Sequence, residues 1–385
     1  MKHNKYYWTI RHKYEKANTL LWASIFKYLP IKQDKIVFNN FFGRGFGDSP
    51  KYIAEEIIRQ ELPYELVWLT KDKNTEVPYG IRKAILPTIR SIYDLSTAKV
   101  IISNVKMTLP YHKKQSQFYI QTWHGSVAFK AIEKDAEEKL DPQYIKETKK
   151  DSTLINLFLS SNSIQTKEIR DSFWYNGEIF ECGSPRNDML YRPNDEKDTI
   201  KQIIGLPLES KVALYAPTFR DDDNTDIYDI DLEKIREILV DKTGDDWRVL
   251  TRLHPNVREK SLMKTSMYVT DTTLYPDMQQ LLFVADILIT DYSTTIYDAA
   301  ILQKVIFLYT PDLDKYNAER GLKPLYFNLG IPHCRNSHEL MDHISKFDKE
   351  EYLKNLDKFL QSITIFDDGY ASWRVVKRIN QIITP

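Results

Sequence analysis

The sequence predicts an α/β protein with two parallel, doubly wound sheets, one in each Rossmann-like half of the chain. Short runs of aromatic and β-branched residues alternate with helical segments, which is typical of βαβ units. A chain of 385 residues is long for one domain and comfortable for two. Several apolar runs lead into Gly, His or hydroxyl residues, and ligands bind beyond the carboxyl ends of parallel strands.

The composition indicates an ordinary globular protein. Hydrophobic residues make up 42% and charged residues 28% of the chain, as in folded domains. Basic and acidic residues number 54 each, so no nucleic-acid partner is expected. Cys182 and Cys334 are too few for a disulfide framework or a metal-ligand set, and they fit a reducing cytosol. No run approaches the ~18 apolar residues of a membrane span, and no secretory signal is recognised.

Residues 1–30 form an amphipathic segment in which six Lys and Arg residues accompany a single acidic residue. Trp22, Phe26 and neighbouring leucines are mixed with these basic residues. This mixture is typical of a helix that lies in a membrane interface. A terminal helix that packs on the body of the protein, with its charges in solvent, is the alternative interpretation.

Residues 31–195 are expected to form the first Rossmann-like half, on the acceptor side. Its strands are predicted at residues 35–42, 65–70, 99–104, 118–120, 157–161 and 179–182, and its helices include 91–98 and a charged surface helix or lid within 131–150. After the first strand, a G-x-G-x-G loop precedes Asp48, Ser49 and Pro50, which suit a helix start. The loop departs from the dinucleotide pattern, so it is a tight turn or an acceptor-binding loop.

The fourth predicted strand leads into Trp123, His124 and Gly125. A histidine beyond a strand end can act as a base near neutral pH. Gly125 allows the backbone to turn and to approach a ligand closely. The alternative is a buried structural histidine beside a core tryptophan.

Residues 196–385 are expected to form the second Rossmann-like half, with a boundary near residues 190–205 and a closing helix at 373–383. Its strands are predicted at residues 211–215, 247–251, 285–290 and 305–309. Two such halves define the architecture of the GT-B class of group transferases, in which the ligand cleft lies between the halves.

Three loops of the second half each follow a strand and carry residues that suit phosphate. Thr218 and Arg220 offer a hydroxyl and a guanidinium, and Arg252 and His254 offer a second cation and an imidazole. The residues from Asp291 to Thr294 open a helix whose free N–H groups suit a diphosphate, and Asp298, one turn in, could hold ribose hydroxyls.

Structural roles remain open for each loop on its own. Asp291 and Ser293 could only cap a helix, Arg220 and Arg252 could pair with acidic residues nearby, and His254 could be a satisfied loop histidine. Three successive strand ends with the same chemistry favour a binding site over these alternatives.

Five ordered motifs resemble the CDP-glycerol glycerophosphotransferases, which build teichoic acid and related polymers in Gram-positive bacteria. The motifs are Gln121-Thr122-Trp123-His124-Gly125, Gly183-x-Pro185-Arg186-Asn187-Asp188, Ala216-Pro217-Thr218-x-Arg220, Arg252-x-His254-Pro255 and Asp291-Tyr292-Ser293. The resemblance covers roughly residues 36–380 and is specific to the family rather than to its substrate.

The resemblance implies a peripheral enzyme on the cytoplasmic face of the membrane. It would transfer a polyol phosphate from a CDP donor to a hydroxyl of a lipid-linked teichoic-acid-type acceptor and release CMP. His124 resembles the family's base and His254 its diphosphate-binding histidine. The implied substrate-binding residues are Trp123, Gly125, Ser126, Val127, Ala128, Arg186, Pro217, Thr218, Arg220, Arg252, Ser293, Thr294 and Asp298.

Two departures from the family pattern affect the expected substrate. Ser126-Val127 stands where many members have Thr-Pro, beside the expected base, and Ser293-Thr294 stands where many have Ser-Ser. Glycerol is favoured over ribitol as the transferred polyol. A GT-B transferase that uses a nucleotide-sugar is a further alternative, and retention of both histidines argues against a non-catalytic binding protein. No cofactor and no metal site are expected, although the acidic residues 221–223 leave a metal open.

Overall fold

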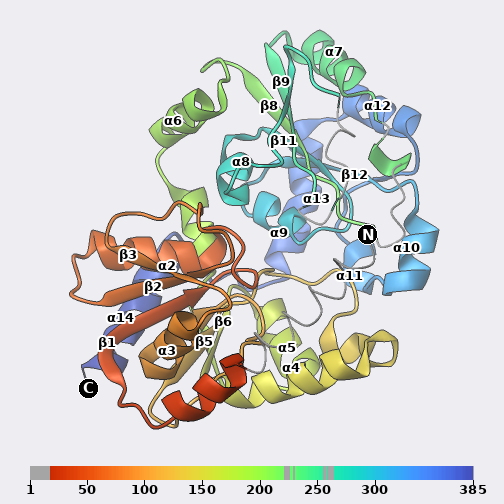
Figure 1. The fold of residues 1–385 in the computed structure, drawn as a ribbon. Helices are drawn as coiled ribbons and strands as arrows, with labels where there is room; N and C mark the ends of the chain where they lie inside the picture. Colours follow the sequence, from red (N-terminus) through yellow and green to blue (C-terminus); the bar gives the residue numbers. More distant parts are fainter. Residues whose placement is uncertain (1–17, 221–225, 229, 255–256, 258–263, 385) are drawn as a thin grey trace, which may run out of the picture.

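The computed structural model describes residues 18–220, 226–228, 230–254, 257 and 264–384, and shows two α/β halves (Figure 1). The first half contains a seven-stranded sheet in the order β3-β2-β1-β4-β5-β6-β7, and the second a six-stranded sheet in the order β10-β9-β8-β11-β12-β13. All of the strand pairs in both sheets are parallel. The predicted fold class, two Rossmann-like halves, is confirmed.

The strands and helices of the first half alternate along the chain. The strands are β1 (Lys32–Asn39), β2 (Glu65–Thr70), β3 (Ile81–Ile85), β4 (Ala98–Ser103), β5 (Phe118–Gln121), β6 (Leu157–Ser160) and β7 (Glu178–Glu181). The helices are α2 (Asp48–Arg59), α3 (Ile89–Thr97), α4 (Pro142–Leu154) and α5 (Ser163–Ser172), with 3-10 helices η1 (Glu133–Lys139) and η2 (Pro185–Tyr191). A helix over residues 18–26 precedes β1.

The second half repeats the pattern. Its strands are β8 (Lys211–Tyr215), β9 (Trp247–Thr251), β10 (Val269–Asp271), β11 (Ile287–Thr290), β12 (Val305–Tyr309) and β13 (His333–Cys334). Its helices are α6 (Asp195–Ile204), α7 (Leu232–Thr243), α8 (Met278–Val284), α9 (Thr295–Ala300), α10 (Leu313–Arg320), α11 (Pro324–Phe327), α12 (Ser337–Lys346), α13 (Lys349–Gln361) and the 3-10 helix η3 (Asp226–Tyr228), followed by α14 (Ala371–Ile383).

Helices cover both faces of the first sheet, because successive residues of a strand point to opposite faces. Ile36 and Phe38 of β1 belong to a core cluster with Ile57 of α2. Val37 between them packs into a different cluster that contains Leu95 of α3. Both faces of β1 are therefore buried, which explains its unbroken apolar run.

Helix α14 returns from the second half to the first. Val375 and Ile379 of α14 share a core cluster with Ile53 of α2, and the two helices lie side by side in Figure 1. Tyr64 adds a hydrogen bond from its hydroxyl to Asn380 Oδ1, at 2.8 Å. The last helix thus ties the two halves together.

The first strand begins and ends three residues earlier than the sequence predicts. β1 ends at Asn39, whereas residues 40–42 were expected to continue it. Phe41 and Phe42 have φ angles of 40° and 59°, which lie outside the β region. Gly43 closes the turn with a backbone hydrogen bond to Asn40 O, at 2.8 Å. The two phenylalanines therefore belong to the loop that precedes α2.

Candidate active site

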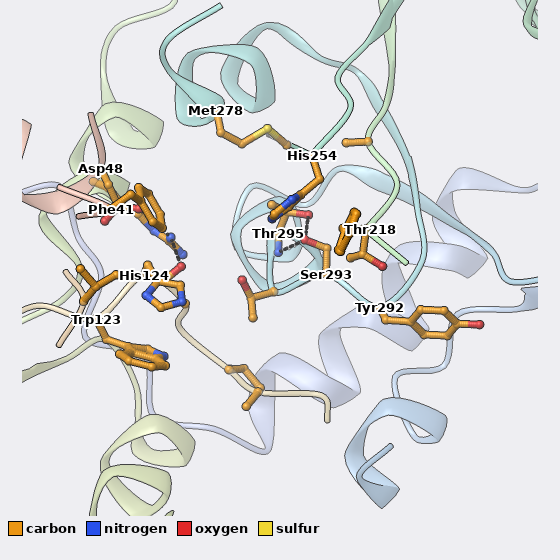
Figure 2. A pocket seen from close by; sticks show the side chains of 18 of the residues that line it. Phe41, Asp48, Trp123, His124, Thr218, His254, Met278, Tyr292, Ser293 and Thr295 are labelled. Carbon is orange, nitrogen blue, oxygen red and sulfur yellow. Dashed lines mark hydrogen bonds and ion pairs between the residues drawn. The ribbon is translucent and has the colours of Figure 1, made fainter. Parts of the chain in front are cut away.

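A cavity of about 720 Å³, called here the central cavity, is lined by residues from both halves. Figure 2 shows Phe41, Asp48, Trp123 and His124 on one side of this space. His254, Thr218 and Ser293 lie on the facing side. We call these two sides the N-terminal wall and the C-terminal wall.

On the N-terminal wall, one hydrogen bond fixes the orientation of His124. Its Nδ1 lies 2.8 Å from the carbonyl oxygen of Asn104, so Nδ1–H donates and Nε2 keeps its lone pair. Burial lowers the pKa of His124, and the bond to Asn104 opposes this effect only in part. The imidazole is therefore neutral at pH 7, in the tautomer that can accept a proton at Nε2.

Aromatic rings and strained backbone surround this imidazole. The rings of Trp123 and Phe41 have their centroids 4.2 Å and 5.4 Å from that of His124. Trp123 has a φ of 54° and Asp48 also has a φ of 54°. Such conformations persist only where the surrounding structure holds them, and they are frequent at functional sites.

Asn104 connects the loop after β1 with the base. Its Oδ1 accepts a hydrogen bond from Phe41 N and its Nδ2 donates to Asn40 Oδ1, both at 2.9 Å. The same residue accepts the Nδ1–H of His124 through its carbonyl. One buried asparagine at the end of β4 therefore positions both the ring of Phe41 and that of His124.

On the C-terminal wall, His254 follows β9 and is exposed to the central cavity. Its pKa is lowered to about 4, mainly by burial between the walls, and further by the charges of Lys130, Arg44 and Arg252. A neutral imidazole among cations suits an anionic ligand.

Two carboxylates, the buried Asp291 and the half-buried Asp312, hold the Thr218 loop from behind. Thr218 N donates to Asp291 Oδ1 at 2.9 Å. Arg220 pairs with Asp291 at 2.9 Å and with Asp312 at 2.6 Å, and its Nη1 donates to Thr218 Oγ1 at 2.7 Å. Arg220 is only 5% exposed and does not line the central cavity. These contacts agree with the alternative interpretation, in which Arg220 pairs with acidic residues of the protein.

The loop before α9 offers hydroxyl and backbone donors to the central cavity. Ser293 and Thr294 both line it, and α9 begins at Thr295. Their two backbone N–H groups have no acceptor among the described residues. A Cβ on Gly125 would lie 3.0 Å from Thr294 Cγ2, so the two walls approach one another closely at this glycine.

Arg186 links the two walls behind the cavity. Its Nη1 donates to the carbonyl oxygen of His124 at 2.7 Å, and its Nη2 lies 2.9 Å from Asp298 Oδ2. Asp298 is fully buried and also accepts a hydrogen bond from Gln279 at 3.0 Å. The carboxylate predicted to hold ribose hydroxyls is thus committed to hydrogen bonds with Arg186 and Gln279, and Asp298 itself does not line the central cavity.

Of the predicted site residues, all but Ser126, Arg220 and Asp298 line the central cavity. Those that do are Trp123, His124, Gly125, Val127, Ala128, Arg186, Pro217, Thr218, Arg252, His254, Ser293 and Thr294. Ser126 lies behind the wall, with its Oγ 3.4 Å from Asp298 Oδ1. Arg252 lines the cavity while it donates to the carbonyl oxygens of Thr272 and Tyr275.

The contributors to the site that were missed from the sequence include Asn104, Lys130 and Asp277, of which the last two line the central cavity. Asn104 follows β4 directly, so its place at a strand end was a usable signal. Asp277 accepts hydrogen bonds from Tyr52 of α2 at 2.7 Å and from Lys51 at 2.5 Å, which no local pattern reveals.

Within the described ranges, no cluster of three or more His, Cys, Asp or Glu side chains has the arrangement of a metal site. The acidic residues 221–223 lie outside them. None of the helices that the structure describes is long and apolar enough to cross a membrane.

The two parallel sheets and the cavity between them define the GT-B class of fold. The family of CDP-glycerol:poly(glycerophosphate) glycerophosphotransferases matches residues 21–381, and the chain belongs to this family. The expected resemblance is confirmed.

Named relatives synthesise teichoic acid. A teichoic acid poly(glycerol phosphate) polymerase of Staphylococcus epidermidis is 32% identical over 89% of this chain and 50% of the relative. The chain thus spans about half the length of this polymerase and of one with the same name from Bacillus subtilis. A teichoic acid glycerol-phosphate transferase of Staphylococcus aureus is 29% identical over 91% of this chain and 94% of the relative.

A solved structure matches the whole fold. It is a histidine-to-asparagine variant of the wall teichoic acid polymerase TagF that was soaked with CDPG. It has a TM-score of 0.84 and 28% identity, and the match covers 100% of this chain and 98% of that chain. Relatives named for ribitol phosphate also match, at 25% and 26% identity.

Proposed function

We propose that this chain transfers glycerol phosphate from CDP-glycerol to a hydroxyl of a lipid-linked, teichoic-acid-type acceptor and releases CMP. The observation that carries the proposal is the pair of neutral histidines, His124 and His254, on opposite walls of one cavity. Membership of the family supports the same reaction, and most of the matching relatives are named for glycerol phosphate.

In this reaction His124 is the general base. Its Nε2 removes the proton of the acceptor hydroxyl as the oxygen attacks the phosphorus that bears the glycerol. A new P–O bond forms to the acceptor, and the P–O bond to the phosphate of CMP breaks. The bond from Nδ1 to Asn104 O, at 2.8 Å, stabilises the protonated ring while it holds the charge. Assistance of this kind accelerates a reaction by about 10²–10⁴-fold.

The C-terminal wall receives the cytidine diphosphate part of the donor. Negative charge grows on the departing phosphate of CMP, where Arg252, His254 and the N–H groups of Ser293 and Thr294 offer fixed donors. Donors that are already oriented lose no energy to reorganisation during the reaction. On this proposal the N-terminal half presents the acceptor and the C-terminal half binds the donor.

CDP-ribitol is the alternative donor, because relatives named for ribitol phosphate belong to the same set of matches. Val127, which lines the cavity beside the base, occupies a position where many members have proline. We propose glycerol because the more similar relatives are named for it.

Release of CMP by the purified protein tests the proposal. The assay compares CDP-glycerol, CDP-ribitol and a panel of UDP-sugars, each with a lipid-linked acceptor. We expect CMP from CDP-glycerol alone. CMP from CDP-ribitol would reassign the polyol, and UDP from a sugar nucleotide would reassign the reaction to glycosyl transfer. Release from no donor, together with no binding of CDP-glycerol in calorimetry, would remove the proposed function.

We further propose that the protein works at the cytoplasmic face of the membrane as a peripheral protein. Support comes from the helix over residues 18–26, where Leu20, Leu21 and Ile25 are 49%, 60% and 46% exposed. Exposed leucines beside basic residues suit a lipid interface. Replacing these three residues with serine should reduce co-sedimentation with anionic liposomes. Unchanged co-sedimentation would favour a helix that only packs on the protein.

A further inference from the structure

Lys130 is carried by the N-terminal half but is held by the C-terminal half. It follows the loop of His124, and its backbone forms an antiparallel bridge with Leu322. On either side of this bridge, Phe129 O accepts a hydrogen bond from Lys323 N and Ala131 N donates to Gly321 O, both at 2.8 Å. These two hydrogen bonds, which make up the bridge, fix the backbone of Lys130 across the junction of the two halves.

The ammonium group of Lys130 has a neutral partner. Its Nζ donates to the hydroxyl oxygen of Tyr316 at 3.0 Å and lies 5.7 Å from the centroid of that ring. Tyr316 stacks on Tyr292, with ring centroids 3.8 Å apart and an interplanar angle of 10°. Tyr292 directly precedes Ser293. The amine is therefore anchored beside the loop proposed to bind phosphate.

No carboxylate of the described chain forms an ion pair with Lys130, although other cations nearby are paired. Lys323 lies 3.0 Å from Glu168, Arg186 lies 2.9 Å from Asp298, and Lys51 lies 2.5 Å from Asp277. Lys130 is partly buried and lines the central cavity. A cation that a protein holds in a partly enclosed site without a carboxylate is set up to receive an anionic ligand.

The proximity of Lys130 to both histidines identifies the part of the ligand that it would meet. Its charge lowers the pKa of both His124 and His254. The acceptor oxygen is placed by His124, and the leaving phosphate is placed by His254. The phosphate that is transferred must lie between the acceptor oxygen and the leaving phosphate of CMP.

We propose that Lys130 is a further catalytic residue, whose ammonium group binds the phosphate that is transferred. This inference rests on the proposed function. Negative charge is spread over the equatorial oxygens of the phosphoryl group in the transition state. A fixed cation opposite these oxygens stabilises that charge. Because Tyr316 belongs to the second half, Lys130 is correctly placed only while the two halves are together.

CDP and CMP separate this role from a purely structural one. CDP carries a second phosphate at the position of the transferred group, whereas CMP lacks it. We expect Lys130→Met to weaken binding of CDP by about 10- to 100-fold, as for a lost hydrogen bond to a charged group, and to leave CMP affinity nearly unchanged. Turnover with CDP-glycerol should fall by about 10²–10³-fold, and Lys130→Arg should retain part of both.

Lys139→Ala is the matched control. Lys139 also connects the two halves, because its Nζ donates to the carbonyl oxygens of Ala318 and Glu319, both at 3.1 Å, but it does not line the central cavity. This variant should keep the wild-type ratio of CDP to CMP affinity. Tyr316→Phe, which removes only the oxygen that holds Nζ, should lower the ratio without removing the charge.

Calorimetric titration of CDP and CMP with the wild type and these variants decides the question. If Lys130→Met leaves the ratio of CDP to CMP affinity unchanged, the inference is overturned and Lys130 is only a structural link between the halves. If Lys130→Met does not fold, an unchanged ratio in Tyr316→Phe overturns it instead. A wild-type protein that binds neither nucleotide would show that the proposed function itself has failed.

Discussion

The two walls of the central cavity hold their histidines in different ways. His124 is fixed by one hydrogen bond to Asn104 and enclosed by the rings of Phe41 and Trp123. His254 is exposed to the cavity, with the ring of Phe219 at 5.9 Å and with cations around it. The pKa of each is lowered, in both cases chiefly by burial.

This difference shows how one residue type can serve two purposes. A base needs a fixed tautomer and a free Nε2 lone pair, which the carbonyl of Asn104 supplies. A ligand for anions needs positive surroundings and access, which Arg252 of the C-terminal wall and Lys130 of the N-terminal half supply around His254. The following predictions test this division between the walls.

The largest effect is expected for His124→Ala. Loss of the base should reduce turnover by about 10²–10⁴-fold, while affinity for the CDP donor stays close to that of the wild type. Steady-state release of CMP and calorimetry measure the two quantities. His112→Ala, which removes an exposed histidine of the same half, should be silent in both. Equal turnover in the His124 variant would remove it from catalysis.

The C-terminal wall should depend on its buried ion pairs for stability. Arg220→Met leaves Asp291 and Asp312 without their cation and should lower the free energy of unfolding by about 3 kcal/mol. Urea denaturation followed by tryptophan fluorescence measures this change. Arg335→Met breaks the exposed pair with Asp314 and should cost less than about 1 kcal/mol. Similar losses in both variants would mean that Arg220 has no special place in the wall.

His254→Ala should affect both binding and turnover, unlike His124→Ala. Without the imidazole, the donor loses a contact to its diphosphate, and affinity for CDP-glycerol should fall by about 10-fold or more. The Michaelis constant and the dissociation constant for the donor should rise together. If only turnover falls, the two histidines have the same role and the division between the walls is wrong.

The smallest effect concerns pH. Because the pKa of His124 is lowered from its usual value near 6.5, kcat/KM should be flat above pH ~6.5 and should fall only at more acidic pH. The stability of the folded protein should change with pH in the same direction, and fall at acidic pH. The lowered pKa of His254, about 4, favours folding above pH ~6.5, and this contribution is lost as the pH falls toward about 4. An acid limb of kcat/KM centred at or above pH 7 would contradict the neutral base.

Much of the site was readable from strand ends. Runs such as Val212–Tyr215 and Ile287–Thr290 are buried on both faces, so they appear in the sequence as unbroken apolar segments. The polar residues that follow them, including Thr218 and Ser293, then fall at one edge of the sheet. The edge strands β3, β10 and β13 were missed, because β3 and β10 are partly exposed, with Lys83 and Asp271 facing solvent, and β13 has only two residues.

Partners that lie far apart in the sequence were not predictable. Arg220 meets Asp312, 92 residues away, and Arg186 meets Asp298, 112 residues away. Both arginines have the chemistry of a phosphate ligand. Burial against a carboxylate makes Arg220 part of the support of the wall, whereas Arg186 keeps contact with the cavity.

The sequence by itself determined the two-sheet fold, the family and the strand ends at which the chemistry gathers, because burial of parallel strands leaves a local pattern of apolar residues. Only the tertiary structure decided which polar side chains face the central cavity, which tautomer His124 adopts, and where Lys130 lies. These outcomes depend on distances between segments that the chain brings together only when α14 and residues 128–131 join the two halves. Local pattern carries no information about such distances.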